Sequence, residues 1–187
     1  MSLKTVWIDT FYKVATGGRN VRNFFTPIGA SIYGSIILVF VVTALYADKL
    51  IGFTNIIPKP VNVILACPFF LSALFLIGWS VRIFLSVKGT PVPFNPPPQL
   101  VTAGPYHFTR NPMLTGVFLL LFGFGVFFGS AALLFVFTPL FIYLNFWELK
   151  SIEEPELEKR LGEDYIKYRK RTPMFFPNVS DIFGKRK

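Results

Sequence analysis

Thirteen residues between two long apolar stretches have the composition of a small-molecule binding site. Residues 104–116 are Gly-Pro-Tyr-His-Phe-Thr-Arg-Asn-Pro-Met-Leu-Thr-Gly, which combine an arginine, an aromatic face and unpaired backbone groups. A second polar set, Glu148, Glu153 and Glu154, follows the next apolar stretch. An arginine binds carboxylates, whereas carboxylates and aromatic rings bind cations. The two sets together would suit a small zwitterion.

Long helices are needed to position these sets, because each set borders an uncharged stretch. Residues 23–47, 61–81 and 113–147 carry no charged side chain over 25, 21 and 35 residues. A helix needs about 20 apolar residues to cross a hydrocarbon core about 30 Å thick, so the first two stretches predict one crossing each. The third is long enough for two crossings, with Gly129-Ser130 as the turn of a helical hairpin. We expect an all-α, polytopic transmembrane bundle of about four spans.

A hairpin in the third stretch would bring the two polar sets together. Residues 106–114 stand at its entry, and the three glutamates stand at its exit. We therefore expect the arginine and the glutamates to be neighbours at one membrane surface. The alternative, which topology alone leaves open, is ordinary helix capping beside a basic loop.

Basic residues concentrate in segments that the predicted topology places on one side. The net charge is +9, and Lys and Arg number four in residues 1–22, two in 48–60, three in 82–112 and ten from 148 onward. Four spans put 17 of them on one side and two on the other, and the positive-inside rule makes the first side cytoplasmic. We expect a multi-pass integral membrane protein with both termini in the cytoplasm. Nucleic-acid binding is excluded, because the aromatic residues lie in the spans and not among the basic residues.

Cysteine and histidine usage excludes several kinds of site. The single cysteine, Cys67, precedes Pro68 inside the second stretch, where it can form no internal disulfide and should be unreactive. One histidine and no Cys/His cluster exclude a structural zinc site, and we expect no bound metal.

Two segments before the thirteen residues have their own patterns. Leu3, Trp7 and Phe11 recur every four residues, which predicts a short amphipathic helix that lies in the membrane interface or packs against the spans. Six prolines between positions 91 and 105 exclude a regular helix there. We expect this segment to form a rigid wall beside the spans, and the alternative is a peptide-binding proline motif.

After the hairpin the sequence predicts further helix. Ser151-Ile152-Glu153-Glu154 matches a capping box, with Pro155 in the first turn of the next helix. An apolar stripe and two i,i+4 ion pairs that face water would follow. The stripe consists of Leu157, Leu161, Tyr165 and Tyr168, and the pairs are Glu156 with Arg160 and Glu163 with Lys167. The basic and aromatic residues 169–177 suit the headgroup region.

The motif Gly-Pro-Tyr-x-x-x-Arg-Asn-Pro-x-Leu-x-Gly at residues 104–116 resembles a known family motif. It is similar to the Gly-x-Tyr-x-x-x-Arg-His-Pro-x-Tyr motif of the isoprenylcysteine carboxyl methyltransferase and phospholipid methyltransferase superfamily. Downstream, Glu153-Glu154, then Leu161-Gly162-Glu163-Asp164-Tyr165-Ile166-Lys167-Tyr168 and Pro177, resemble that superfamily's C-terminal motif. The resemblance covers about residues 99–177. It implies one membrane-embedded domain over residues 1–187, with a catalytic part at about 88–177.

This resemblance implies an S-adenosylmethionine-dependent methyltransferase that acts on a lipophilic or lipid-linked acceptor from the bilayer. The methyl group would pass directly to the acceptor, so catalysis would depend on proximity and in-line orientation. Arg110 and Glu154 would be the catalytic residues. Leu100 and Val101 would contact the cofactor through their backbone, Gly104, Tyr106, Asn111, Pro112, Met113 and Leu114 would hold it, and Glu153 or Glu154 would meet its ammonium group.

Three positions depart from the superfamily pattern. Asn111 replaces the usual histidine, and Leu114 replaces a tyrosine. Carboxyl-methylating members carry an arginine one turn before the glutamate pair, where this chain has Leu149 beside Lys150. An amine or phenol is therefore as plausible an acceptor as a carboxylate, and Glu148 or His107 are weak candidates for the base that an amine would need.

Two other functions remain open at this point. Membrane sterol-type reductases, which use NADPH, resemble the same superfamily in their C-terminal half but are typically longer. A non-catalytic membrane adaptor could use the proline-rich segment.

Overall fold

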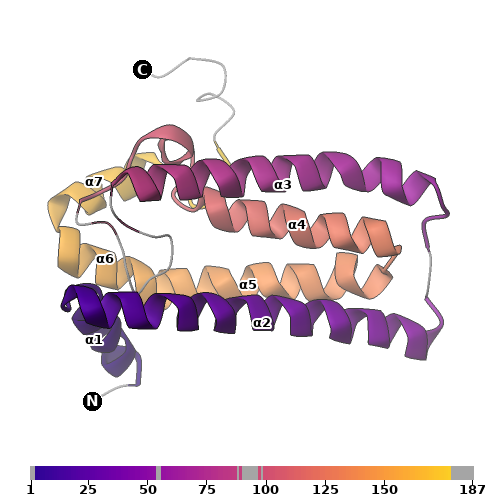
Figure 1. Ribbon diagram of the computed structural model, residues 1–187, viewed down its shortest axis with the longest axis horizontal. Coiled ribbons are helices and arrows are strands. Elements are labelled where there is room, and N and C mark those ends of the chain that lie inside the picture. Colours follow the sequence, from indigo (N-terminus) through magenta and orange to yellow (C-terminus); the bar gives the residue numbers. More distant parts are fainter. Residues whose placement is uncertain (1–2, 54–55, 88, 90–96, 98, 178–187) are drawn as a thin grey trace.

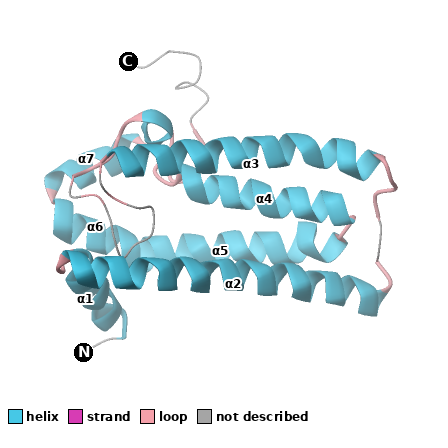
Figure 2. Ribbon diagram, viewed as in Figure 1, coloured by secondary structure: helices cyan, strands magenta, loops and turns pink. Residues whose placement is uncertain are grey.

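The computed structural model describes residues 3–53, 56–87, 89, 97 and 99–177. Every regular element in these ranges is a helix, as Figure 2 shows. In chain order they are α1 (Leu3–Ala15), α2 (Arg19–Ile51), α3 (Val61–Ser86), the 3₁₀ turn η1 (Gly104–His107), α4 (Pro112–Phe128), the π-helix η2 (Leu133–Phe137), α5 (Thr138–Glu148), the π-helix η3 (Leu149–Glu153), α6 (Glu154–Leu161) and α7 (Glu163–Arg171). The predicted all-α class is confirmed.

The long helices lie side by side along the long axis of the molecule (Figure 1). α1, η1, α6 and α7 lie at one end, which we call the site end, and the connection from α4 to η2 lies at the other, which we call the turn end. Three helices, Phe24–Ile51, Val61–Ser86 and Leu133–Leu161, are long and apolar enough to cross a membrane. The fourth apolar helix, Pro112–Phe128, has 17 residues, which is at the short limit for a span.

The hairpin turn falls where the sequence predicts it. α4 ends at Gly129, whose φ of +60° is a left-handed conformation that glycine adopts without strain. The next helix starts at once, and Asp48 of α2 binds its first residues. The Asp48 carboxylate accepts hydrogen bonds from Ser130 Oγ and from the Ala132 backbone N–H, the latter at 2.9 Å. These bonds join α2 to the hairpin at the turn end.

The buried Asp48 also explains why α2 is longer than predicted. An uncharged stretch ends at Ala47, but the helix continues to Ile51 and ends at Gly52, whose φ is +81°. Asp48 is only 4% exposed, because its charge is satisfied by the hairpin. A charged residue therefore does not end this helix. Its partner groups lie 82 and 84 residues further along the chain, so the local sequence does not reveal them.

Two glycines let α3 and α4 pack closely. A Cβ added at Gly116 would lie 2.8 Å from Ile77 Cγ1 and 3.1 Å from the Ala73 carbonyl oxygen. One added at Gly123 would lie 2.8 Å from the Phe70 ring. Small residues at such positions are the common way for membrane helices to approach each other.

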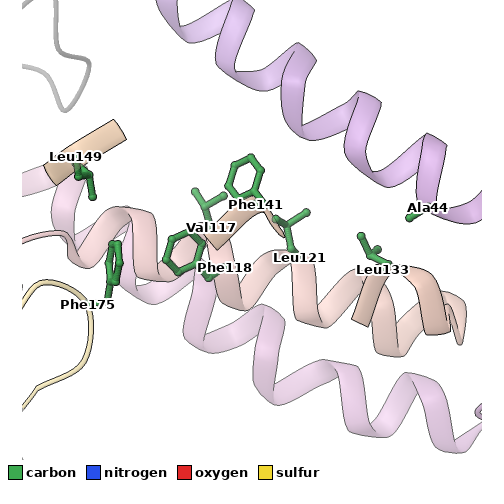
Figure 3. Packing of buried hydrophobic residues seen from close by; sticks show 8 residues of the cluster. All are labelled: Ala44, Val117, Phe118, Leu121, Leu133, Phe141, Leu149 and Phe175. Atoms are coloured by element: carbon green, nitrogen blue, oxygen red, sulfur yellow. The ribbon is translucent and has the colours of Figure 1, made fainter. Parts of the chain in front are cut away.

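The hydrophobic core runs along the hairpin and reaches the site end. Phe118 contacts Phe141 across the hairpin and Phe175 near the C-terminus, with ring centroids 6.2 and 5.1 Å apart. Figure 3 shows the buried cluster, which consists of Ala44, Val117, Phe118, Leu121, Leu133, Phe141, Leu149 and Phe175. The core therefore ties the C-terminal segment to the start of α4.

The predicted capping box is wrong. The chain stays helical from Leu133 to Leu161, and Glu153 has helical φ and ψ of −70° and −47° with no side-chain cap hydrogen bond. Each of the two prolines in this helix, Pro139 and Pro155, follows a π-helical turn within two residues. A wider turn relieves the clash between a proline ring and the preceding carbonyl, so the helix continues.

The N-terminal helix packs against the protein, as one of the two alternatives left open by the sequence predicts. α1 contacts α6 and η3, and Asp9 pairs with Lys159 at 2.8 Å. Lys159 also lies 4.5 Å from the centre of the Tyr12 ring. Trp7 is nevertheless 53% exposed, so α1 both packs on the protein and presents an aromatic surface. The predicted proline-rich wall falls mostly on residues outside the described ranges.

Candidate functional site

An ion pair joins the two polar sets at the site end. Arg110 Nη1 donates a hydrogen bond to Glu154 Oε1, and their side chains are 11% and 9% exposed. Arg110 precedes α4 and Glu154 begins α6, so the contact spans the hairpin. The expected proximity of the arginine and the glutamates is confirmed for Glu154.

Glu154 has a second basic neighbour. Arg169 of α7 lies 3.6 Å from Glu154 Oε2 and also binds Glu158. The Glu154 charge is therefore balanced by two guanidinium groups, and its role in the described structure is to hold α7 and the residue before α4 against α6.

The C-terminal segment 173–175, which we call the strap, fixes the start of α4. The backbone N–H groups of Arg110 and Asn111 donate to the carbonyls of Pro173 and Met174, at 2.9 and 3.1 Å. Thr115 Oγ1 donates to the Phe175 carbonyl at 3.0 Å. These bonds fix the backbone position of Arg110 beside Glu154.

The residues before Arg110 are anchored on α3. Gly104 has a φ of +61°, and a Cβ there would lie 3.0 Å from Trp79 Nε1 and 3.1 Å from Ile83 Cγ1. The buried Tyr106 ring packs edge-on against Phe84 with centroids 5.0 Å apart. Only glycine satisfies both the backbone conformation and the contact at position 104.

Three buried tyrosines lie at the site end. Tyr168 Oη donates to the Tyr106 carbonyl at 2.6 Å, and Tyr165 lies near both Glu154 and Arg110. Burial raises the pKa of Tyr106, Tyr165 and Tyr168 above the ordinary value for tyrosine. All three remain neutral at physiological pH, so they interact with charged groups through their hydroxyl groups or ring faces.

Glu148 and Glu153 differ from Glu154 because neither is paired. Both are partly buried, and among the described residues neither has an ion pair or a hydrogen bond. Glu153 lies within electrostatic reach of the other carboxylates, Glu148, Glu154 and Glu156, and of Arg160. Nearby in the bundle, Tyr33 Oη of α2 donates to Asn145 Oδ1 of α5 at 3.1 Å. The site end thus contains two carboxyl groups that have no partner among the described residues.

This arrangement can now be compared with known proteins. Residues 61–164, more than half of the chain, match the family described as phospholipid methyltransferase. The chain belongs to the phospholipid methyltransferase family. A search of curated proteins finds no match.

Membership in the phospholipid methyltransferase family implies a membrane methyltransferase. With its long apolar helices, the chain is an integral membrane protein. The match begins at the start of α3, earlier than the resemblance in the motifs, and it ends just before Tyr165. α3 is therefore part of the family's shared region, and α1 and α2 lie outside it.

The other residues expected to bind a cofactor lie in different environments. Leu100 and Val101 are half-buried and precede the Gly104 anchor, and Met113 is half-buried in the first turn of α4. Two positions that depart from the family pattern have protein partners. Leu114 packs against the hydrophobic core, and Asn111 Nδ2 donates weakly to the Met174 carbonyl at 3.4 Å.

Pro112 is the remaining predicted cofactor residue. It is buried at the first position of α4, where its missing N–H costs no hydrogen bond. Its place in the fold indicates a structural contribution to the start of the helix.

Sequence reasoning missed two interactions and placed a third wrongly. Arg169, expected at the headgroups, belongs to α7 and binds Glu154, and Tyr168 bonds to the Tyr106 backbone. Glu156 and Arg160 form the predicted ion pair at 2.8 Å, but their side chains are only 7% and 11% exposed and do not face water. The i,i+4 spacing predicted the pair, whereas its burial depends on the segments that pack over α6.

The second predicted pair is absent. Glu163 and Lys167 are both exposed, and no ion pair joins these two described residues.

Proposed function

We propose that the protein transfers a methyl group from S-adenosylmethionine to a lipophilic acceptor that enters from the bilayer. The observation that carries this proposal is the contrast between adjacent glutamates. Glu154 is held by two arginines, whereas Glu153 has no partner among the described residues. An unpaired, partly buried carboxylate is costly unless a cation binds it.

The donor set at the site end fits this cofactor. S-adenosylmethionine carries an ammonium, a carboxylate and a sulfonium, and its two cationic groups suit the unpaired carboxyl groups of Glu148 and Glu153. Glu153 would bind the ammonium group. Arg110 Nε is a buried N–H donor without a hydrogen-bond partner, and it would be available to the carboxylate. Leu100 and Val101 would add apolar contact.

The chain's own residues would bind and orient the reactants. When bound, S-adenosylmethionine supplies an electrophilic methyl group, which an acceptor nucleophile displaces directly. Glu154 keeps Arg110 in place, and the strap fixes the backbone that carries it. Holding both reactants in line accounts for most of the rate enhancement expected of such a reaction.

The environment of Leu149 and Lys150 bears on the acceptor. Leu149 is buried in the core, and Lys150 is exposed and lies 5.5 Å from the centre of the Phe146 ring. Neither supplies a buried cation one turn before the glutamate pair. We therefore favour an amine or hydroxyl acceptor over a carboxylate, with Glu148 as the group that could take its proton.

We also propose four spans with both termini in the cytoplasm, because the basic residues concentrate at the site end. The test uses Cys67→Ala protein with a new thiol at Phe53 or at Lys170, both of which are exposed. An impermeant thiol reagent applied outside cells should label the Phe53→Cys protein only. Equal labelling of both would contradict the topology.

Cofactor-dependent thermal stabilisation tests the reaction class. S-adenosylhomocysteine should raise the melting temperature of the purified protein, and NADPH should not. Stabilisation by NADPH alone would favour a reductase, and stabilisation by neither would favour an adaptor. With membranes and methyl-labelled cofactor, label should appear in lipid-extractable material, and label found only in water-soluble products would contradict a lipid acceptor.

A further inference from the structure

A buried ion pair on α6 reaches across to the segment that precedes the site. Arg160 Nε binds Glu156 Oε1 at 2.8 Å, and Arg160 Nη1 donates to the Pro97 carbonyl at 3.1 Å. Two different N–H groups of one guanidinium are therefore used. Nε–H binds Glu156 in α6, and Nη1–H binds Pro97, which lies 63 positions earlier in the chain. Arginine suits this contact because its N–H donors are on separate nitrogens in a rigid plane, whereas the three donors of lysine share one nitrogen.

Pro97 is held from the opposite side by the end of α3. Gly89 is buried there, and its N–H donates to the Phe84 carbonyl at 3.0 Å. A Cβ added at Gly89 would lie 2.7 Å from Pro97 N and 2.8 Å from Pro97 Cα, a distance that would force the backbone to move. Pro97 thus has α6 on one side and the end of α3 on the other.

These contacts fix one end of the segment that contains Leu100 and Val101. The other end is fixed by Gly104, which packs on Trp79 and Ile83. Leu100 and Val101 therefore lie between two anchored points. Neither anchor touches the Arg110–Glu154 pair in the described contacts.

We infer that Arg160, held by Glu156, is a positioning residue that sets the cofactor affinity of the Leu100–Val101 segment through the Pro97 carbonyl. This inference rests on the proposed function, since it assumes that the segment contacts S-adenosylmethionine. A buried salt bridge often contributes little net stability to a protein. Positioning of Pro97 would give the Glu156–Arg160 pair a role that does not depend on a contribution to stability.

The test measures S-adenosylhomocysteine binding by calorimetry on the full-length protein in micelles. Arg160→Ala should raise the dissociation constant about tenfold, which is the size of one hydrogen bond to a charged group. Arg160→Lys should recover only part of this loss. Lys167→Ala, which removes an exposed lysine on α7, is the matched control and should bind like the wild type.

Gly89→Ala displaces Pro97 from the other side and leaves α6 unchanged. It should also weaken binding, and its effect should not add fully to that of Arg160→Ala because both act on Pro97. With an acceptor supplied in native membranes, the KM for S-adenosylmethionine should rise in both variants while kcat at saturating cofactor stays unchanged.

Each outcome has a distinct meaning. If the wild type does not bind S-adenosylhomocysteine, the proposed function fails and this inference fails with it. If the wild type binds and the Arg160 and Gly89 variants bind equally well, the proposed function stands and the inference is overturned. A lower melting temperature with an unchanged dissociation constant would likewise make the pair purely structural.

Discussion

The two ends of the bundle both contain buried acidic side chains, but these side chains differ in their hydrogen bonding. At the turn end, both oxygens of Asp48 accept hydrogen bonds, one from Ser130 and one from the Ala132 backbone. At the site end, Glu154 is paired, but Glu148 and Glu153 have no partner among the described residues. Burial alone therefore does not distinguish the two ends; the completeness of their hydrogen bonding does.

This difference separates acidic residues that stabilise the fold from acidic residues that are available to bind a ligand. A buried charge whose every partner belongs to the chain contributes to folding. A buried charge without a partner raises the free energy of the folded chain until a cation arrives. Variants of a paired acidic residue should therefore change mainly stability, and variants of an unpaired one should change mainly binding.

The largest effect is expected for Glu154→Ala. Removing one partner of a buried ion pair leaves Arg110 uncompensated, which costs roughly 3–5 kcal/mol. We expect this loss in the free energy of unfolding, measured in micelles without ligand. The control is Glu158→Ala, whose partner Arg169 is 36% exposed and whose loss should cost at most about 1 kcal/mol. Equal losses in the two variants would contradict the structural role of Glu154.

Glu153→Gln should change binding and not stability. Loss of a charge-assisted bond to a buried cation costs roughly 1.5–3 kcal/mol, or about a ten- to hundredfold rise in the dissociation constant for S-adenosylmethionine. The ligand-free protein should be as stable as the wild type or more so, because an unpaired carboxylate is removed.

Calorimetry and thermal unfolding of the same Glu153→Gln preparation check both parts. Glu163→Gln, on an exposed position of α7, should leave both values unchanged. A lower melting temperature with an unchanged dissociation constant would show that Glu153, like Asp48, stabilises the fold and does not bind the ligand.

Asp48→Asn should have the smallest effect and the opposite pattern. The amide keeps one acceptor but loses charge and its second acceptor, so we expect about 1 kcal/mol less stability. S-adenosylhomocysteine should bind with the wild-type dissociation constant, since Asp48 binds the connection from α4 to η2. That connection lies at the end of the bundle opposite α6 and α7 (Figure 1). A clear loss of affinity would show that the two ends are coupled and would contradict a purely structural role for Asp48.

Much of the architecture followed from composition and spacing. Uncharged stretches predicted the apolar helices, and Gly129-Ser130 predicted the turn, because a hydrocarbon core sets the length of a span. The hairpin in turn predicted that Arg110 would meet the glutamates at its exit, and it meets Glu154. These are statements about length and order along the chain, which a sequence contains directly.

Rotation of the helices about their axes could not be predicted in the same way. Only the structure decided that Glu154, and not its neighbour Glu153, faces Arg110 and Arg169. The π-helical turn η3 lies just before them, and one extra residue in a turn rotates all later residues of the helix by about 100°. A periodicity argument assumes a regular helix and cannot include that rotation.

An all-helical membrane protein, its hairpin and its family membership follow from the amino-acid sequence alone. Only the tertiary structure shows which polar side chains have bonding partners within the described chain and which do not. Asp48 is satisfied by groups more than 80 residues away, and the Arg160 pair is buried by Pro97, which lies 63 residues before it. A side chain's partners depend on which distant segments pack over it, and packing is a property of the folded chain rather than of any local stretch.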